Sequence, residues 1–313
     1  MVTIKEKNFV SAVLYVHDCE ETIGDFIKSL HKVLQGSFEK FEIICVDDAS
    51  SDDSVRQIKQ VGGGLDGACI SIIHMSYYQG LELSMNAGID LAIGDFVFEF
   101  DKAFIDYDEK LIMDVYNHSL KGFDIVSTSS NAKKSASSRL FYKVFNKNAH
   151  TQYPISTETF RVLSRRAINR VHGMSKTIPY RKALYANCGL KLDVITYAPI
   201  ANVKYKKEKQ YGKERQAVAA DSLILFTNIA YKLSLGMTVL MMLSTVVTAV
   251  YAIVVFISQK PVAGWTTTTL FMSFSFFGIF AILAVVIKYL SILVDLIFKK
   301  QKYVVEGIEK LGK

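Results

Sequence analysis

Two long stretches without a charged side chain constrain this chain more than any other feature. Residues 235–257 and 262–287 contain no Asp, Glu, Lys or Arg, and only SQKP separates them. Each stretch exceeds the roughly 20 residues that a helix needs to cross a bilayer. The sequence therefore predicts a transmembrane hairpin over residues 235–298, with Pro261 at the turn or at the first position of the second helix. Whether that helix ends at 287 or continues to 298 is left open.

The basic residues around the hairpin predict its orientation. The turn contains Lys260 alone, whereas many more cations flank the two outer ends. These are Lys204, Lys206, Lys207, Lys209, Lys213, Arg215, Lys232, Lys299, Lys300 and Lys302. Because positive residues favour the cytoplasmic side, we expect a multi-pass protein of the cell (inner) membrane, with both termini cytoplasmic. The N-terminal MVTIKEKNF does not resemble a signal peptide, which agrees with this orientation.

Charge and cysteine content exclude other classes. The net charge is +7, but much of the excess lies beside the apolar stretches, where anionic lipid or a lipid phosphate explains it without nucleic acid. The four cysteines, Cys19, Cys45, Cys69 and Cys188, lack the spacing of a metal site. We assign them no role.

The first 200 residues alternate predicted strands and helices. Apolar runs typical of strands occupy 10–16, 41–48, 68–75, 95–101 and 124–130, and helical spacing occupies 20–34, 51–61 and 84–93. This alternation predicts an α/β domain over residues 1–200, with a mostly parallel sheet and helices on both faces. Ligands of such sheets bind at the carboxyl ends of the strands. Residues 17–20, 47–52 and Asp101 all fall there.

Several motifs then resemble a known family. VSAVLYVHDCEE, CVDDASSDDS, YYQGLELSMNAGIDLAIGDF and FEFD follow one another in the order of family 2 glycosyltransferases, which have the Rossmann-like GT-A fold. ASSRLFYKVFN, FRVLSRR and KKEKQYGKER extend the likeness over nearly the whole chain, toward polyprenyl-phosphate glycosyltransferases related to dolichol-phosphate mannose synthase. The resemblance implies an inverting enzyme that moves sugar from a nucleotide-sugar donor, UDP-linked, to polyprenyl phosphate on the cytoplasmic leaflet, for cell-surface polysaccharide synthesis.

The resemblance also implies a nucleotide site at Glu20, Asp48 and Asp101. In the family, the acids at the positions of Glu20 and Asp48 accept hydrogen bonds from the base and ribose. The alternative is that the acids at 47–52 only form a turn and cap the next helix. Near Glu20, the sequence departs from the family motif at Asp18 and Cys19.

The metal site departs from the family pattern. The first acid of the family's DxD falls on Asp101, but the second position is Ala103. We expect a divalent cation, Mg²⁺ or Mn²⁺, at Asp101, with Asp106 as the next ligand and Asp108 as another candidate in the same turn. An alternative alignment, Glu99-Phe100-Asp101, keeps an acid-x-acid pattern but breaks the register from Gly94.

The position of the catalytic base also departs from the family pattern. The family's acid before the FR pair is Thr159 here, and Glu158 beside it is the candidate base. Glu158 could instead be a solvated loop acid, because a phosphate acceptor is already ionised. Arg161 matches the family's arginine and would meet either the nucleotide phosphates or a structural carboxylate.

The lipid acceptor is assigned to a basic juxtamembrane segment, residues 201–234. The family's basic loop corresponds to Lys206, Lys209, Gly212 and Arg215, whose cations could clamp a lipid phosphate or simply anchor the chain at the interface. Residues 220–233 have helical spacing typical of an interfacial helix, and residues 299–313 form a basic cytoplasmic tail. Two other functions stay open: transfer to a lipid-linked oligosaccharide, or a non-catalytic scaffold. A homo-oligomer is also left open.

Overall fold

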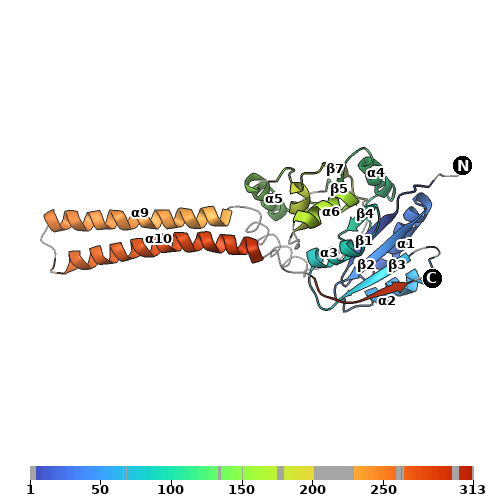
Figure 1. Cartoon of the computed structure of the whole chain (residues 1–313), viewed down its shortest axis with the longest axis horizontal. Helices are drawn as coiled ribbons and strands as arrows, with labels where there is room; N and C mark the ends of the chain where they lie inside the picture. The colour runs from blue at the N-terminus through green and yellow to red at the C-terminus, as the bar shows by residue number, and fades with distance from the viewer. Residues whose placement is uncertain are drawn as a thin grey trace. The chain divides into compact units, whose positions relative to one another are not determined.

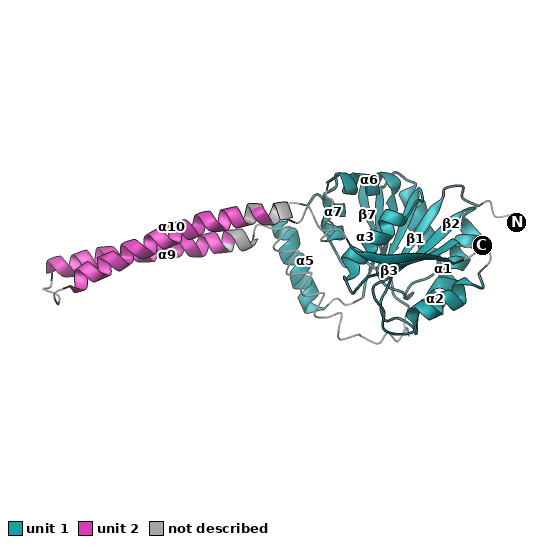
Figure 2. Ribbon diagram, turned by 60° about the horizontal axis from the view of Figure 1, so that its bottom comes forward, with its two compact units in different colours: residues 1–218, 300–313 teal, residues 219–299 magenta. Residues whose placement is uncertain are grey.

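The computed structural model describes residues 5–65, 67, 69–132, 135–149, 151–174, 180–200, 229–258, 262, 264–297 and 303–311. The chain divides into two compact units, residues 1–218 together with 300–313, and residues 219–299 (Figure 2). The first unit contains the sheet and the second contains two long helices. The chain therefore leaves the sheet domain, forms the helical unit and returns.

Eight strands of the described residues form one mixed sheet, in the order β7-β5-β6-β4-β1-β2-β3-β8. Their bounds are β1 Val10–Val16, β2 Phe41–Asp47, β3 Cys69–Met75, β4 Phe96–Phe100, β5 Ile125–Ser130, β6 Phe160–Ser164, β7 Leu192–Tyr197 and β8 Val305–Leu311. Strands β1 to β5 and β7 run parallel, whereas β6 and β8 are antiparallel to their neighbours. The predicted mostly parallel α/β sheet is confirmed.

Helices cover both faces of this sheet (Figure 1). They are α1 Ile23–Ser37, α2 Ser54–Gly62, α3 Leu81–Leu91, α4 Lys110–Ser119, α5 Ala136–Asn148, α6 Arg165–Met174 and α7 Arg181–Asn187. Helix α1 contacts α2 and α4, and apolar residues of α1 and α4 share one core cluster with Ala12 and Leu14 of β1. Helix α3 packs on β1 from the other face, where a Cβ at Gly88 would lie only 2.3 Å from Cγ1 of Val13. Glycine at 88 thus lets α3 lie directly on the strands.

Strand β4 presents apolar side chains on one face of the sheet and acidic side chains on the other. Phe98 and Phe100 belong to the apolar core cluster. Glu99 alternates with them and is also fully buried, on the opposite face. Asp101 follows directly after the strand, so β4 delivers two acids to the face away from the main core.

The second unit consists of α9 Ile229–Ser258 and α10 Trp265–Ile297, which pack against each other. Residues 234–258 and 265–290 have mean hydropathies of 2.5 and 2.6, so both helices are long and apolar enough to cross a membrane. Large apolar side chains such as Val247 and Phe274 are exposed along them. Helix α10 continues past residue 287 to Ile297, although its candidate membrane span ends at Leu290, so the end of the transmembrane segment stays a prediction. Pro261 lies outside the described residues.

A feature that sequence analysis did not predict is strand β8. Residues 305–311 follow the second apolar helix and pair antiparallel with β3, at one end of the sheet. Partly buried residues alternate with exposed ones along the whole strand. The C-terminal segment is therefore part of the sheet domain, not a tail without structure of its own.

Candidate active site at the carboxyl ends of the strands

Asp48 lies directly after β2 and organises the loop between β3 and α3. Its carboxylate accepts hydrogen bonds from the backbone N–H of Gln79 at 2.7 Å, the backbone N–H of Gly80 at 2.8 Å and the hydroxyl of Tyr15 at 2.9 Å. Gly80 has φ +84°, a conformation that glycine adopts without strain. Asp48 is fully buried, so in this conformation the carboxylate holds the loop and does not face solvent.

The loop after β1 contacts both Asp48 and the start of α2. Nδ1 of His17, after β1, lies 2.8 Å from the backbone oxygen of Asp48, and its ring lies 4.6 Å from that of Tyr78. The carboxylate of Glu20 accepts from the N–H of Asp53 at 2.9 Å, while the N–H of Glu20 donates to Asp52 at 2.9 Å. Glu20 therefore contacts the start of α2. Within residues 47–52, Asp47 accepts from the N–H of Ser50 at 3.1 Å and Asp52 from the N–H of Ser54 at 3.0 Å, as the turn-and-capping alternative requires. The contact of Glu20 with a nucleotide stays a prediction.

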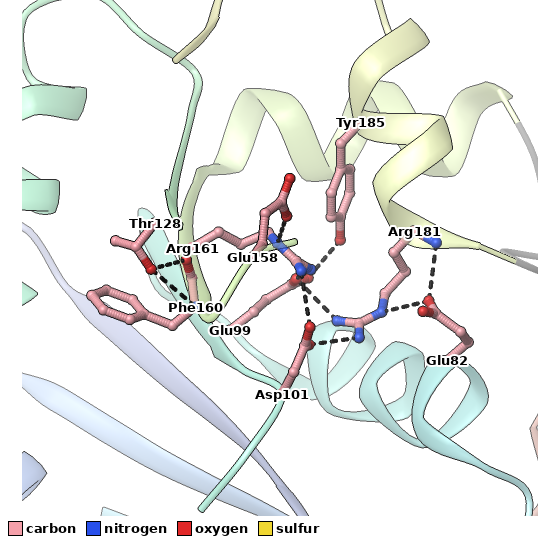
Figure 3. Close-up of polar contacts among 9 residues, drawn as sticks. All are labelled: Glu82, Glu99, Asp101, Thr128, Glu158, Phe160, Arg161, Arg181 and Tyr185. Atoms are coloured by element: carbon pink, nitrogen blue, oxygen red, sulfur yellow. Dashed lines mark hydrogen bonds and ion pairs between the residues drawn. The ribbon is translucent and has the colours of Figure 1, made fainter. Parts of the chain in front are cut away.

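The end of β4 has a different kind of site, built on two arginines (Figure 3). The antiparallel register of β4 and β6 places Arg161 directly opposite Glu99. Glu99 is fully buried and pairs with the guanidinium of Arg161 and, at 3.0 Å, with that of Arg181 at the start of α7. The hydroxyl of Tyr185 donates to the other oxygen of Glu99. A charge in the middle of a buried strand is thus satisfied on every side, as burial demands.

Asp101 is held by the same two guanidinium groups. Its two oxygens accept from Arg161 at 3.0 Å and from Arg181 at 2.8 Å. Burial would raise the pKa of Asp101, but the charges of Arg161, Arg181 and Lys182 outweigh it and lower that pKa below its usual value. Burial would lower the pKa of Arg161, but its three carboxylate partners raise it above the ordinary value. Asp101 and Arg161 therefore stay charged at neutral pH.

Two further carboxylates complete the group. Glu158 accepts from Nε of Arg161 at 3.1 Å, and its side chain is only 7% exposed. Glu82, in the first turn of α3, accepts from Nε of Arg181 at 2.9 Å. We call the whole group the arginine–carboxylate cluster: Glu82, Glu99, Asp101, Glu158, Arg161, Arg181 and Tyr185. Its four carboxyl groups outnumber its two guanidinium groups.

The predicted metal ligands are not grouped for a cation. Asp101 uses both oxygens on guanidinium groups, and Asp106 accepts from the hydroxyl of Tyr197 at 2.8 Å. The described part of the chain contains no cluster of three or more His, Cys, Asp or Glu side chains able to hold a metal ion. Ala103, at the family's second acid position, is buried and contributes no ligand. These residues do not fit a preformed divalent-cation site.

The structure thus brings together some predicted residues and not others. Asp101, Glu158 and Arg161 meet in the cluster, whereas Glu20 and Asp48 lie at other strand ends of the same sheet. Lys206, Lys209 and Arg215 lie outside the described residues. Sequence reasoning missed Glu82, Arg181 and Tyr185. The sequence offered one signal for the cluster, the acid Glu99 within an otherwise apolar strand, but it did not indicate which residues pair with it.

Comparisons with known proteins agree with this architecture. The sequence model of the family described as Glycosyl transferase family 2 matches residues 11–172. An uncharacterised glycosyltransferase of Synechocystis sp. is 26% identical over 194 residues, which cover 60% of each chain. The undecaprenyl-phosphate 4-deoxy-4-formamido-L-arabinose transferase of Proteus mirabilis is 30% identical over 128 residues, 41% of this chain and 39% of that protein.

One solved structure shows the same fold. The mannosyltransferase PcManGT from Pyrobaculum calidifontis, in complex with GDP-Man and Mn²⁺, has a TM-score of 0.50 and 16% identity, covering 68% of this chain and 61% of that one. This likeness, with the mostly parallel sheet, confirms the expected GT-A-type architecture. The chain thus spans about 60% of the length of the Synechocystis relative and of this mannosyltransferase.

Proposed function

This chain belongs to glycosyl transferase family 2, and from that premise we propose that it moves a sugar from a nucleotide-sugar donor, uridine-linked, to polyprenyl phosphate on the cytoplasmic leaflet. The product would supply sugar for cell-surface polysaccharide. The transfer forms a bond between a phosphate oxygen of the acceptor and the anomeric carbon. The bond from that carbon to the nucleotide breaks, and the diphosphate leaves with the electron pair.

The observation that carries this proposal is the meeting of acidic strand ends in one sheet. Strand β1 lies between β2 and β4, so the loops after Asp47, Val16 and Phe100 come to one edge. In a parallel sheet that edge is where ligands bind. Asp48 shapes one side of it through backbone N–H groups, and Asp101 borders the arginine–carboxylate cluster on the other.

The roles within the cluster follow from its contacts. Glu158 is proposed to orient the acceptor behind the anomeric carbon, because Nε of Arg161 fixes its carboxylate. An ionised acceptor phosphate leaves little work for a general base, so positioning is the larger part of that role. Arg161 and Arg181 stay cationic, but their side chains are only 1% exposed and pair with the carboxylates of the cluster, so we assign them to holding Glu158 and Asp101 in place.

A divalent cation at Asp101 and Asp106 stays a prediction. The excess of carboxylates in the cluster is compatible with an added cation, but both oxygens of Asp101 are engaged by arginine. No step proposed above depends on the metal. Turnover measured after chelation and again after titration with Mg²⁺ or Mn²⁺ tests the need for a metal, and the same titration of Asp101→Asn tests the ligand: a higher metal concentration for half-maximal rate would support Asp101.

The membrane arrangement is proposed from the chain path. β3 precedes the two apolar helices and β8 follows them, yet the strands pair in one sheet. This pairing supports a hairpin whose two ends lie on the same side of the membrane, and the lysine asymmetry supports the cytoplasmic side. A reporter enzyme active only outside the cytoplasm should be silent when fused after Lys313. A bright fusion would reverse the orientation.

The acceptor is proposed to bind through Lys206, Lys209 and Arg215. Replacing all three with Gln should raise the polyprenyl phosphate concentration needed for half-maximal rate about tenfold or more, with little change in donor affinity. Neutral detergent removes the anionic surface, so simple interfacial anchoring predicts no change there. An unchanged acceptor titration would reject this clamp.

One experiment tests the proposed function as a whole. Purified full-length protein is incubated with polyprenyl phosphate and a panel of radiolabelled nucleotide sugars, and label is measured in the extracted lipid. Label on the lipid phosphate supports the proposal. Label only when a lipid-linked oligosaccharide is supplied favours that acceptor instead, and no label with any donor favours a scaffold.

A further inference from the structure

The segment that returns from the second apolar helix is bound to the loop that Asp48 organises. The side-chain amide of Gln79 accepts from the backbone N–H of Val304 at 2.9 Å and donates to the backbone oxygen of Val304 at 2.6 Å. Gln79 thereby satisfies both polar backbone groups of one residue just before β8, as a neighbouring strand would. The N–H of Ser76 also donates to that oxygen, at 3.2 Å.

The two hydrogen bonds between Gln79 and Val304, which we call the Val304 clamp, are connected directly to Asp48. The side chain of Gln79 holds Val304, while its own backbone N–H donates to Asp48 at 2.7 Å and the next N–H, of Gly80, donates at 2.8 Å. Val304 and Gln79 are 225 positions apart in the sequence. One glutamine therefore joins the strand end after β2 to a segment made after both apolar helices.

Two more contacts fasten the same segment nearby. The hydroxyl of Tyr303 donates to Asp90 of α3 at 2.6 Å, and burial together with that carboxylate raises the pKa of Tyr303, so the hydroxyl keeps its proton. Glu309 lies 3.5 Å from Nε2 of His74, whose Nδ1 lies 3.4 Å from Asp47. The segment therefore reaches both the residue before Asp48 and the helix after its loop.

We propose that residues 303–311 are a positioning element of the donor site, acting through Gln79. The Val304 clamp fixes the loop of residues 76–80, so that the N–H groups of Gln79 and Gly80 point at Asp48 and the exposed Tyr78 keeps its place beside His17. The inference rests on the proposed function for the statement that this loop borders the nucleotide. The contacts themselves do not depend on it.

Loss of the hydrogen bonds to Val304 should weaken binding of the nucleotide-sugar donor selectively. Gln79→Ala removes two hydrogen bonds to Val304 and leaves the backbone N–H groups in place. The KM for the nucleotide sugar should rise about three- to tenfold, the effect of roughly one net hydrogen bond, with little change in kcat or in the KM for polyprenyl phosphate. Gln79→Glu keeps the acceptor for the Val304 N–H but turns a carboxylate oxygen toward the Val304 carbonyl oxygen, so the rise should be at least as large as for Gln79→Ala.

The experiment uses the full-length protein in detergent, with UDP as the binding probe. Hydrogen–deuterium exchange of residues 76–81 and calorimetric UDP affinity are measured for wild type, Gln79→Ala, Gln79→Glu and the control Ile308→Thr. Ile308 lies on the same strand with its side chain exposed, so its replacement should change neither quantity. Thermal melting establishes that each variant is folded.

The outcomes separate this inference from the proposed function. Faster exchange at 76–81 with weaker UDP binding in Gln79→Ala supports the positioning role. Unchanged exchange overturns the clamp, and faster exchange with unchanged UDP affinity overturns its role in donor binding. If wild type binds neither UDP nor any other nucleotide, the proposed function fails together with the donor role, while exchange still decides whether the segment holds the loop.

Discussion

Asp48 and Asp101 both follow a buried strand of the same sheet, yet their surroundings differ in kind. Asp48 is held by neutral donors, two backbone N–H groups and a tyrosine hydroxyl. Asp101 is held by two guanidinium groups that are themselves almost completely buried. The first carboxylate shapes a loop, whereas the second balances charge inside the domain.

The difference predicts how each site responds to substitution. Neutral partners can be rearranged or replaced at the cost of single hydrogen bonds. A buried ion group cannot lose one member without leaving an uncompensated charge in the interior. We therefore expect substitutions around Asp101 to affect folding as well as turnover, and substitutions around Asp48 to act mainly on the loop.

The largest effect is expected for Arg161→Met. This change leaves Glu99, Asp101 and Glu158 without their shared cation, and breaking a buried pair in this way costs about 3–5 kcal/mol. Thermal and denaturant unfolding of the purified protein measure the loss. Arg166→Ala is the control, because Arg166 lies on α6 with its side chain 71% exposed, and should change the stability little. A stable Arg161→Met protein would show that the cluster is not needed for folding.

A smaller loss is expected for Asp101→Asn. Two guanidinium contacts are weakened, which should cost about 1.5–3 kcal/mol. Turnover should also fall strongly, because Asp101 borders the proposed reaction site. Full activity combined with wild-type stability would contradict both roles.

For Asp48→Asn the expected stability loss is lower still. The amide oxygen can still accept from part of the three donors, so about one hydrogen bond to a carboxylate is lost, at the lower end of the range for such bonds, about 1.5 kcal/mol. The free energy of donor binding should change more than the free energy of unfolding, because the loop of residues 76–80 loosens. Asp53→Ala, an exposed position paired only with Arg56 among the ion pairs described, is the matched control. A loss of stability larger than that of Asp101→Asn would reverse the comparison.

The smallest effect appears only in acid. The folded-state pKa of Asp101 lies below the value of 3.8 for a free side chain, so its stabilisation is complete above about pH 4. As the pH falls from there toward the folded-state pKa, protonation removes it. Melting temperatures of Asp101→Asn should therefore decline less steeply below pH 4 than those of wild type.

Part of the acid response should remain in that variant. Burial would raise the pKa of Asp18, but hydrogen bonds from Ser51 and the charge of His17 lower it, so Asp18 contributes in the same direction. Identical slopes for wild type and Asp101→Asn would show that Asp101 has an ordinary pKa in the folded state.

The sequence predicted the first of the two strand ends better than the second. β1 to β4 could be recognised because each is a short, mainly apolar run, and Asp48 could be placed because it directly follows such a run. The partners of Asp101 could not, because Arg181 is 80 positions away and starts a helix with no recognisable motif. Arg161 was found through a family motif, but its partner Glu99 required the β4–β6 register, which no local pattern specifies.

Strand β8 was missed for a related reason. Residues 305–311 are few and follow an apolar helix, so a basic tail was the simpler interpretation. Pairing with β3 depends on an open position at the end of the sheet, which only the assembled fold reveals.

That pairing has a consequence for the order in which the protein matures. β3, with the sequence CISIIHM, is complete early in synthesis, but its partner emerges only after both apolar helices have been made. Until then β3 is an outer strand with unpaired N–H and C=O groups, the kind of surface that recruits other chains into aggregates. Synthesis of both apolar helices and release of the last residues therefore cover this edge of the nascent domain, and a delay at either step prolongs its exposure to chaperones and proteases.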